Sequence, residues 1–173
     1  ESLEEREFVG ELALTGELRG VPGVLSASLA AAREGCALFL PAANAGEAAR
    51  PPRSRVFGAA DLGSLCAHLQ GDRLLPRAEA TTTPLRRQPP DLADVKGQHR
   101  ARRALEIAAA GGHSLLMMGP PGTGKTLLAS RLPGILPELD EAASLEVATI
   151  HSVAGQPDHP LGTPPFRAPH HTA

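Results

Sequence analysis

The spacing of hydrophobic and polar residues predicts strands and helices that alternate along the first 75 residues. Apolar and polar residues alternate around Thr15-Gly16, which predicts a pair of strands or one bent strand over residues 10–18. Short apolar runs predict two further strands, at residues 36–40 and 55–57. Helical patterns cover residues 21–33, 44–50 and 61–70. The predicted order is β-β-α-β-α-β-α, a small α/β layer.

Residues that begin and end helices support these boundaries. Pro22 stands at the start of the first helical pattern and Gly35 just beyond its end. Asp61 is placed to cap the third helix, and Gly71 is placed to end it. The pattern then changes: residues 76–90 are rich in proline and have no apolar periodicity, which predicts an interdomain linker.

Residues 91–173 have a different organisation. An amphipathic helix is predicted over residues 98–110, and Gly111-Gly112 would end it. The apolar run at residues 113–118 predicts a buried strand. Two more helices are predicted, at residues 126–132 and 140–153, and residues 155–173 are loop-like. We therefore expect an α/β fold throughout, with domains at 1–75 and 91–173.

The segment between the predicted strand and the helix at 126–132 matches the pattern G-x-x-x-x-G-K-[ST] at every fixed position. It reads Gly119-Pro120-Pro121-Gly122-Thr123-Gly124-Lys125-Thr126. Glycines let the backbone turn tightly and direct several N–H groups at phosphate oxygens, and the start of the following helix favours the same anion. Lys125 would reach the β- and γ-phosphates, and the Thr126 hydroxyl would contact Mg²⁺. The predicted ligand is ATP with Mg²⁺.

Composition narrows the remaining classes of function. The net charge is −2, so overall charge gives no argument for nucleic-acid or membrane binding. No apolar run has the length of a membrane span, and no signal-peptide pattern is present. Cys36 and Cys66 have no C-x-x-C spacing, which suggests reduced core thiols in a cytoplasmic protein. The chain starts at Glu1 and ends inside what looks like an unfinished domain, so we expect a fragment of a longer protein.

Six segments, in order along nearly the whole chain, carry a resemblance to a known family. They are residues 10–18, 41–44, 91–98, 103–113, 150–155 and 165–172. Together they resemble the ComM (YifB) family of magnesium-chelatase-like AAA+ ATPases. The resemblance implies a front domain similar to the Lon protease domain (ribosomal S5 domain 2-like), followed by the N-terminal part of an AAA+ module. It also implies a hexameric ring that moves along branched or single-stranded DNA during natural transformation.

The resemblance also implies roles for individual residues. In AAA+ proteins the stretch that matches residues 94–98 lies against the adenine, which suggests adenine contacts for Val95, Lys96 and Gly97. The alternative is an ordinary helix entry that Gln98 opens. Lon-type proteases use a Ser–Lys pair, but the lysine position here is Leu25, and no lysine occurs in residues 1–95. We therefore expect no peptidase activity.

The C-terminal loop contains a second group of candidate residues. Arg167, His170 and His171 could face DNA or a neighbouring subunit, and a purely structural loop is an equal alternative. Together with His151 and His159, these histidines could suggest a zinc site, but their spacing matches no standard ligand pattern. The basic cluster at residues 100–103 could touch phosphate, but a solvated helix face is the preferred interpretation.

Several catalytic parts of an ATPase are not evident in the sequence. No apolar strand precedes the acids between residues 138 and 146, so none resembles the Mg²⁺-holding acid that phosphoryl transfer requires. We expect that acid, the water-orienting residue and the arginine finger to follow Ala173, and the chain alone not to turn over ATP. The alternatives are a magnesium-chelatase-type motor subunit and a nucleotide-dependent assembly module.

Overall fold

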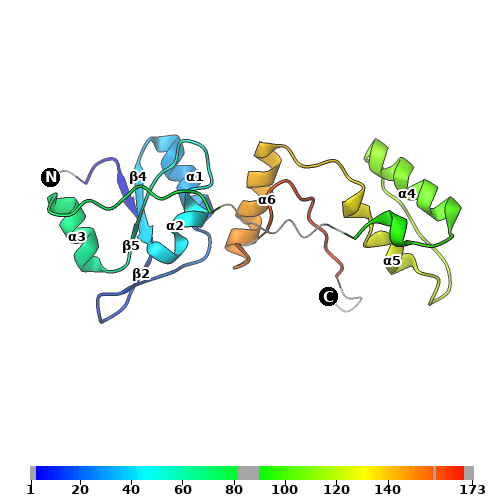
Figure 1. Cartoon of the computed structure of the whole chain (residues 1–173), viewed down its shortest axis with the longest axis horizontal. Helices are drawn as coiled ribbons and strands as arrows, with labels where there is room; N and C mark the ends of the chain where they lie inside the picture. Colours follow the sequence, from blue (N-terminus) through cyan, green and yellow to red (C-terminus); the bar gives the residue numbers. More distant parts are fainter. Residues whose placement is uncertain (1–2, 82–89, 158, 170–173) are drawn as a thin grey trace. The chain divides into compact units, whose positions relative to one another are not determined.

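The structure is a computed structural model that describes residues 3–81, 90–157 and 159–169. Contacts between residues divide the chain into two compact units (Figure 1). The first contains the described parts of Glu1–Pro84 and Leu145–His159. The second contains those of Leu85–Ser144 and Pro160–Ala173. Within the described ranges, no helix has both the length and the apolar character that a membrane crossing requires.

The first unit is built on a parallel three-stranded sheet. Its strands, in spatial order, are β1 (Arg6–Phe8), β4 (Ala37–Pro41) and β5 (Arg55–Ala59). A separate antiparallel hairpin pairs β2 (Glu11–Leu12) with β3 (Leu18–Arg19) and turns through Gly16, whose φ is 87°. This hairpin and the α/β character confirm the sequence interpretation, whereas β1 was missed.

Two helices bury one face of this sheet and a third lies on the other (Figure 1). They are α1 (Val24–Glu34), α2 (Ala42–Ala48) and, on the opposite face, α3 (Leu62–Gln70). The core between the sheet and the first two helices consists of aliphatic residues, namely Val24, Ala31, Leu38, Leu40, Ala48 and Val56. Alternation along β4 separates the two faces, because Leu38 and Leu40 point into this core while Phe39 points away.

Phenylalanines form a row across the other face of the sheet. Phe8, Phe39 and Phe57 occupy paired positions on the three strands. Their ring centroids lie 5.3 and 5.1 Å apart, and neighbouring rings are tilted by only 19° and 18°. His68 of α3 packs against Phe39 and Phe57 at 5.2 and 5.3 Å. Stacked aromatic pairs contribute beyond their buried area, so this row helps to fix the strand register.

Residues at the helix ends take the capping roles that the sequence predicts. Asp61 accepts a hydrogen bond from the Ser64 N–H at 2.7 Å and forms a capping box with that residue. Hydrogen bonds from Ser64 hold the pKa of the Asp61 carboxyl below its ordinary value. Gly35 and Gly71 end their helices in the left-handed conformation. The core-thiol prediction is wrong for Cys66, which is exposed on α3; Cys36 is half-buried, and both thiols are free.

The segment after α3 stays in contact with the first unit. The Ala78 N–H donates to the Val56 carbonyl at 2.8 Å, and the Thr81 N–H donates to the Gly46 carbonyl at 3.0 Å. The first residues of the predicted 76–90 linker therefore pack against the sheet and α2. Residues 82–89 lie outside the described part of the chain.

The second unit is largely helical. Its elements are η1 (Leu92–Asp94), α4 (His99–Gly111), α5 (Lys125–Ala129) and η2 (Leu132–Gly134). Its core consists of Leu92, Val95, Leu105 and Leu128. The strand predicted at residues 113–118 is wrong, because the segment has no strand assignment. The described part of this unit holds no strand that could pair with residues 113–118, so their backbone forms no ladder of hydrogen bonds.

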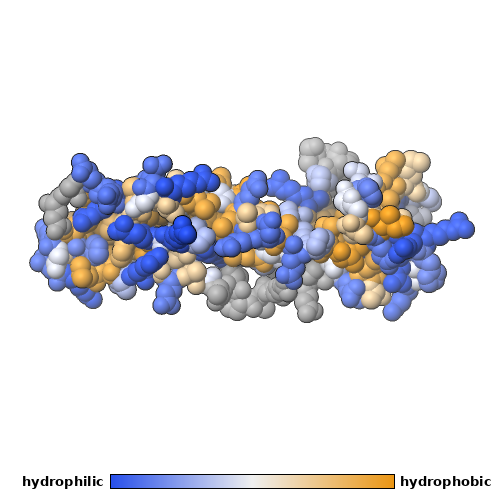
Figure 2. All heavy atoms as spheres, turned by 90° about the horizontal axis from the view of Figure 1, so that it is seen from above, coloured by the Kyte–Doolittle hydropathy of each residue, from blue (hydrophilic) through white to orange (hydrophobic). Residues whose placement is uncertain are grey.

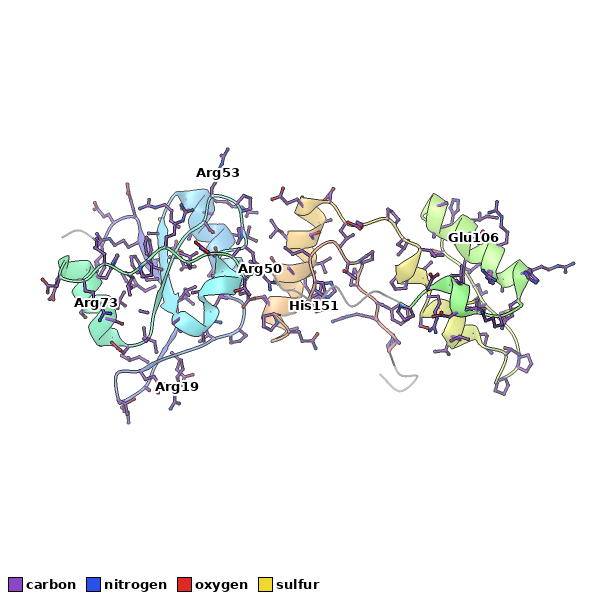
Figure 3. The ribbon with its side chains drawn as sticks, in the orientation of Figure 1. Arg19, Arg50, Arg53, Arg73, Glu106 and His151 are labelled. Atoms are coloured by element: carbon purple, nitrogen blue, oxygen red, sulfur yellow. The ribbon has the colours of Figure 1, made fainter. Side chains whose placement is uncertain are left out.

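Helix α6 (Glu141–Val153) begins one residue after the predicted start at residue 140, and most of it clusters with the first unit. The Gly23 N–H, at the start of α1, donates to the Ser152 carbonyl at 3.1 Å. The Arg50 guanidinium donates to the Pro157 carbonyl at 3.0 Å, and the rings of His151 and His159 stack at 4.1 Å. Figure 3 labels Arg50 and His151. The two hydrogen bonds attach the end of α6 and the residues up to Pro157 to the rest of the first unit, while the ring stacking lies within this segment. The predicted boundary at residue 91 does not include this packing.

Candidate functional site

The phosphate-loop segment has a backbone that its glycines make possible. Gly122 and Gly124 have φ values of 82° and 80°, and Gly119 has a φ of 157°. The first two lie in the left-handed region, where a Cβ is strained. Around Gly122, an added Cβ would meet no atom within 4 Å, so backbone conformation and not crowding requires glycine there. The loop ends at Gly124, which is the N-cap of α5.

The side chain of Lys125 holds this loop by donating hydrogen bonds to backbone carbonyls of the loop. Its Nζ donates to the Gly119 carbonyl at 2.8 Å and to the Pro120 carbonyl at 2.7 Å. The Thr123 hydroxyl also donates to the Pro120 carbonyl, at 2.9 Å. An ammonium carries three N–H donors, so an anion in the loop would compete with these carbonyls for them. The arrangement places a cation where the sequence pattern requires one.

A cleft of about 390 Å³ lies beside this loop. Its lining comes from the start of α4, the segment of residues 115–118, the loop and α5. The lining residues are Gln98, Arg100, Ala101, Ala104, Leu115, Leu116, Met117, Met118, Thr123, Lys125 and Leu128. Its volume lies in the range of small-molecule sites. One wall is apolar, whereas Arg100 and Lys125 supply positive charge, so the cleft suits a ligand with a flat apolar part and an anionic part.

The segment of residues 115–118 also leaves apolar side chains at the surface. Leu116 and Met118 are 81% and 84% exposed, and Leu115 is 41% exposed. Figure 2 shows apolar residues at the surface in the region of α4 and α5. The sequence predicts a buried strand here, and in the described part of the second unit no strand lies beside this segment to cover these side chains.

The sequence-predicted site residues differ in their exposure and in whether they line the cleft. Lys125 begins α5, and Thr126 follows it with an exposed side chain. Val95 is 2% exposed and packs in the core of the second unit, while Lys96 and Gly97 are exposed. Of the described residues that line the cleft, the first along the chain is Gln98, which directly follows Gly97.

Sequence reasoning missed part of the cleft. The sequence indicates Gln98 only as a helix opener, and for the basic cluster that contains Arg100 it favours a solvated helix face over a contact with phosphate. The basic cluster divides: Arg100 lines the cleft, whereas Arg103 pairs with Glu106 at 3.0 Å on the exposed side of α4. Figure 3 labels Glu106 on this helix. Spacing along α4 gives no signal that separates Arg100 from Arg103, since residues three apart lie on the same face of a helix.

The C-terminal candidates are only partly described. Arg167 is exposed, and His170 and His171 lie outside the described residues. No group of three or more potential metal ligands occurs within the ranges that the structure describes.

Comparison with known proteins identifies relatives along the whole chain. Residues 91–173 match the family model described as magnesium chelatase, subunit ChlI. An uncharacterised protein of Mycobacterium tuberculosis is 50% identical over 177 residues, which cover 100% of this chain and 35% of that protein. The protein YifB of Escherichia coli is 45% identical over 99% of this chain and 34% of its own length. Competence protein ComM of Haemophilus influenzae is 44% identical, over 99% of this chain and 35% of its own length. The chain thus spans about a third of the length of these curated relatives.

Proposed function

Because the chain belongs to the magnesium-chelatase-like family that includes YifB and ComM, we propose that its second unit binds ATP with Mg²⁺ as part of an AAA+ motor. The observation that carries this proposal is the loop of residues 119–126. Its glycines adopt conformations that other residues avoid, and Lys125 lies against its carbonyls beside a cleft with one apolar wall.

The residues of the loop fit this ligand by the chemistry of their donors. Backbone amides from Gly122 to Thr126 would cradle the phosphates, and Lys125 would leave the Gly119 and Pro120 carbonyls to contact them. The Thr126 hydroxyl would hold Mg²⁺. When bound, Mg·ATP supplies the phosphoryl group whose transfer drives a motor. Val95, Lys96 and Gly97 remain proposed adenine contacts; for Val95 this requires the adenine to reach the edge of the core.

We propose further that the full-length protein containing this chain forms a homo-oligomeric, hexameric ring that works on branched or single-stranded DNA in the cytoplasm. The resemblance to ComM-type motors supports this, together with the similarity to a protein named for competence. Arg167 is exposed and available for a contact with DNA or a neighbouring subunit, and His170 and His171 are proposed to act with it.

The first unit is proposed to be a Lon-like domain without peptidase activity. Its parallel sheet with helices on both faces is consistent with an α/β domain of that kind. Leu25, at the position of the catalytic lysine in Lon-type proteases, is fully buried in α1 and carries no ionisable group.

A magnesium-chelatase-type motor subunit is the second candidate, because the match over residues 91–173 is to a chelatase subunit. A nucleotide-dependent assembly module is the third. Similarity to YifB and ComM extends over both units and therefore includes the first. This favours the DNA motor over the chelatase-type subunit.

ATP hydrolysis by the full-length protein, with and without forked DNA, tests the proposal. We expect forked DNA to stimulate hydrolysis and Lys125→Ala to abolish it, because the ammonium is the charged group of the phosphate loop. Arg103→Ala is the matched control, since it removes an exposed cation from the same unit, outside the cleft.

The alternatives give different outcomes. Hydrolysis that ignores DNA would favour the chelatase-type motor. Binding of ATP without hydrolysis would favour the assembly module. Equal ATP binding by the native protein and by Lys125→Ala would refute the assignment of the site itself.

A further inference from the structure

Gln98 connects α4 to the phosphate loop in an unusual backbone conformation. Its φ and ψ are 48° and 39°, in the left-handed region, and it directly follows Gly97, whose φ is 66°. Among the non-glycine residues that the structure describes, only Glu5 and Arg53 share a positive φ. A left-handed non-glycine residue costs energy, so surrounding interactions must hold it there.

The side chain of Gln98 provides such an interaction. Its Nε2 donates to the Thr123 carbonyl at 3.3 Å, across 25 positions in sequence. A Cβ added at Gly124 would lie 3.0 Å from the same nitrogen, so the amide rests directly on the loop. Gln98 is the N-cap of α4, yet α4 has no side-chain cap hydrogen bond. The side chain thus bonds to the phosphate loop and leaves its own helix end uncapped.

We propose that Gln98 is a positioning residue that holds the phosphate loop in its anion-binding shape. The proposal rests on the proposed binding of ATP at this loop. A peptide unit is planar, so fixing the Thr123 carbonyl also fixes the direction of the Gly124 N–H on its other side. That N–H is one of the donors that would face the phosphates.

The contribution of Gln98 matters most when the ligand binds. In the ligand-free loop, Lys125 holds the carbonyls of Gly119 and Pro120. An incoming phosphate draws the ammonium away and removes both bonds. The hydrogen bond from Gln98 ends on the Thr123 carbonyl and not on the carbonyls of Gly119 and Pro120, so the ammonium can leave those two without breaking it. It therefore preserves the loop when the internal bonds are lost, which lowers the ordering cost of binding.

The test uses Gln98→Met, which keeps the length of the side chain and the strain of the backbone but removes the donor. In the full-length protein, we expect the KM for ATP to rise about three- to tenfold, the equivalent of one hydrogen bond, while kcat changes less than twofold. In the nucleotide-free 173-residue chain, we expect faster amide hydrogen exchange in residues 119–126 and unchanged exchange in the second half of α4. Arg103→Ala should leave both readouts as in the native protein.

The two readouts separate failure of the positioning role from failure of the proposed function. If Lys125→Ala loses ATP binding while Gln98→Met behaves like the native protein in both assays, the positioning role is wrong and the nucleotide site stands. If the native protein does not bind ATP, the exchange measurement still decides whether Gln98 holds the loop. A fall in kcat with unchanged KM would also overturn the proposal, because it would place the effect in the chemical step.

Discussion

Replacing Leu105 by alanine should destabilise the second unit strongly, because this side chain is central to a small core. Leu105 is 1% exposed on α4 and packs with three other buried residues, Leu92, Val95 and Leu128. The same helix presents Ala101 and Ala104 to the cleft. The substitution therefore tests whether this core stabilises the helix that lines the proposed nucleotide site.

The magnitude follows from burial. Leucine has three more carbon atoms than alanine, and at about 0.8 kcal/mol for each buried carbon group their transfer costs about 2.4 kcal/mol. The residual cavity adds to this, and measured Leu→Ala substitutions in cores cost about 2.7–5 kcal/mol. Met117 is half-buried beside this cluster and is flexible enough to fill part of the space. We therefore expect a loss near 3 kcal/mol in the free energy of unfolding.

Urea denaturation followed by hydrogen-exchange mass spectrometry can measure this loss for peptides of α4 alone. The control is Ile107→Ala on the same helix, where the side chain is 52% exposed and we expect a loss below about 1 kcal/mol. Equal losses in the free energy of unfolding for the two variants would refute the assignment of Leu105 to the core of the second unit. A loss that appeared in peptides of the first unit instead would contradict the division into two units.

Three predictions concern the first unit. Gly58→Ala should lower its thermal midpoint, since the new Cβ would lie 2.8 Å from the Cβ of Ala45 and overpacking costs about 1–3 kcal/mol; an unchanged midpoint would contradict this packing. The lowered pKa of Asp61 means that its cap stabilises α3 above the ordinary carboxyl pKa and is lost as pH falls through the lower folded value. Asp61→Asn should remove that acid-range dependence of α3 exchange, and a dependence that persisted would exclude this carboxyl as its source. Asn44→Ala should cost about 1–3 kcal/mol in urea denaturation, because Asn44 accepts from the Val21 N–H at 2.9 Å and donates to the Val21 carbonyl at 3.0 Å; native-like stability would show that water replaces both bonds.

The parts of the fold that sequence predicted are those with local causes. The hairpin turn at Gly16 and the helix that runs from Asp61 to Gly71 depend on residues within a few positions of one another. Strand β1 was missed because Glu4-Glu5-Arg6-Glu7 is polar and has no alternation, and its pairing partner β4 lies 31 positions away in register. Such a parallel pairing leaves no mark in the local pattern.

The candidate site divides in the same way. The glycines and Lys125 could be predicted because backbone turns and a phosphate ligand require those residue types at that spacing. The cleft wall at residues 115–118 was recognised as apolar but assigned to a buried strand. The role of Gln98 depends on its φ and on a contact 25 positions away, and residue type alone indicates neither.

The row of phenylalanines has a spectroscopic consequence. The chain has no tryptophan and no tyrosine, and three of its four phenylalanines, Phe8, Phe39 and Phe57, stack on one sheet of the first unit. The fourth, Phe166, is 47% exposed in the second unit. Near-ultraviolet circular dichroism arises from aromatic rings held in asymmetric surroundings, so its signal in this chain should come almost entirely from the first unit. That unit therefore carries its own optical reporter, and an adenine nucleotide added to the chain would be observed against a protein background with almost no aromatic absorption.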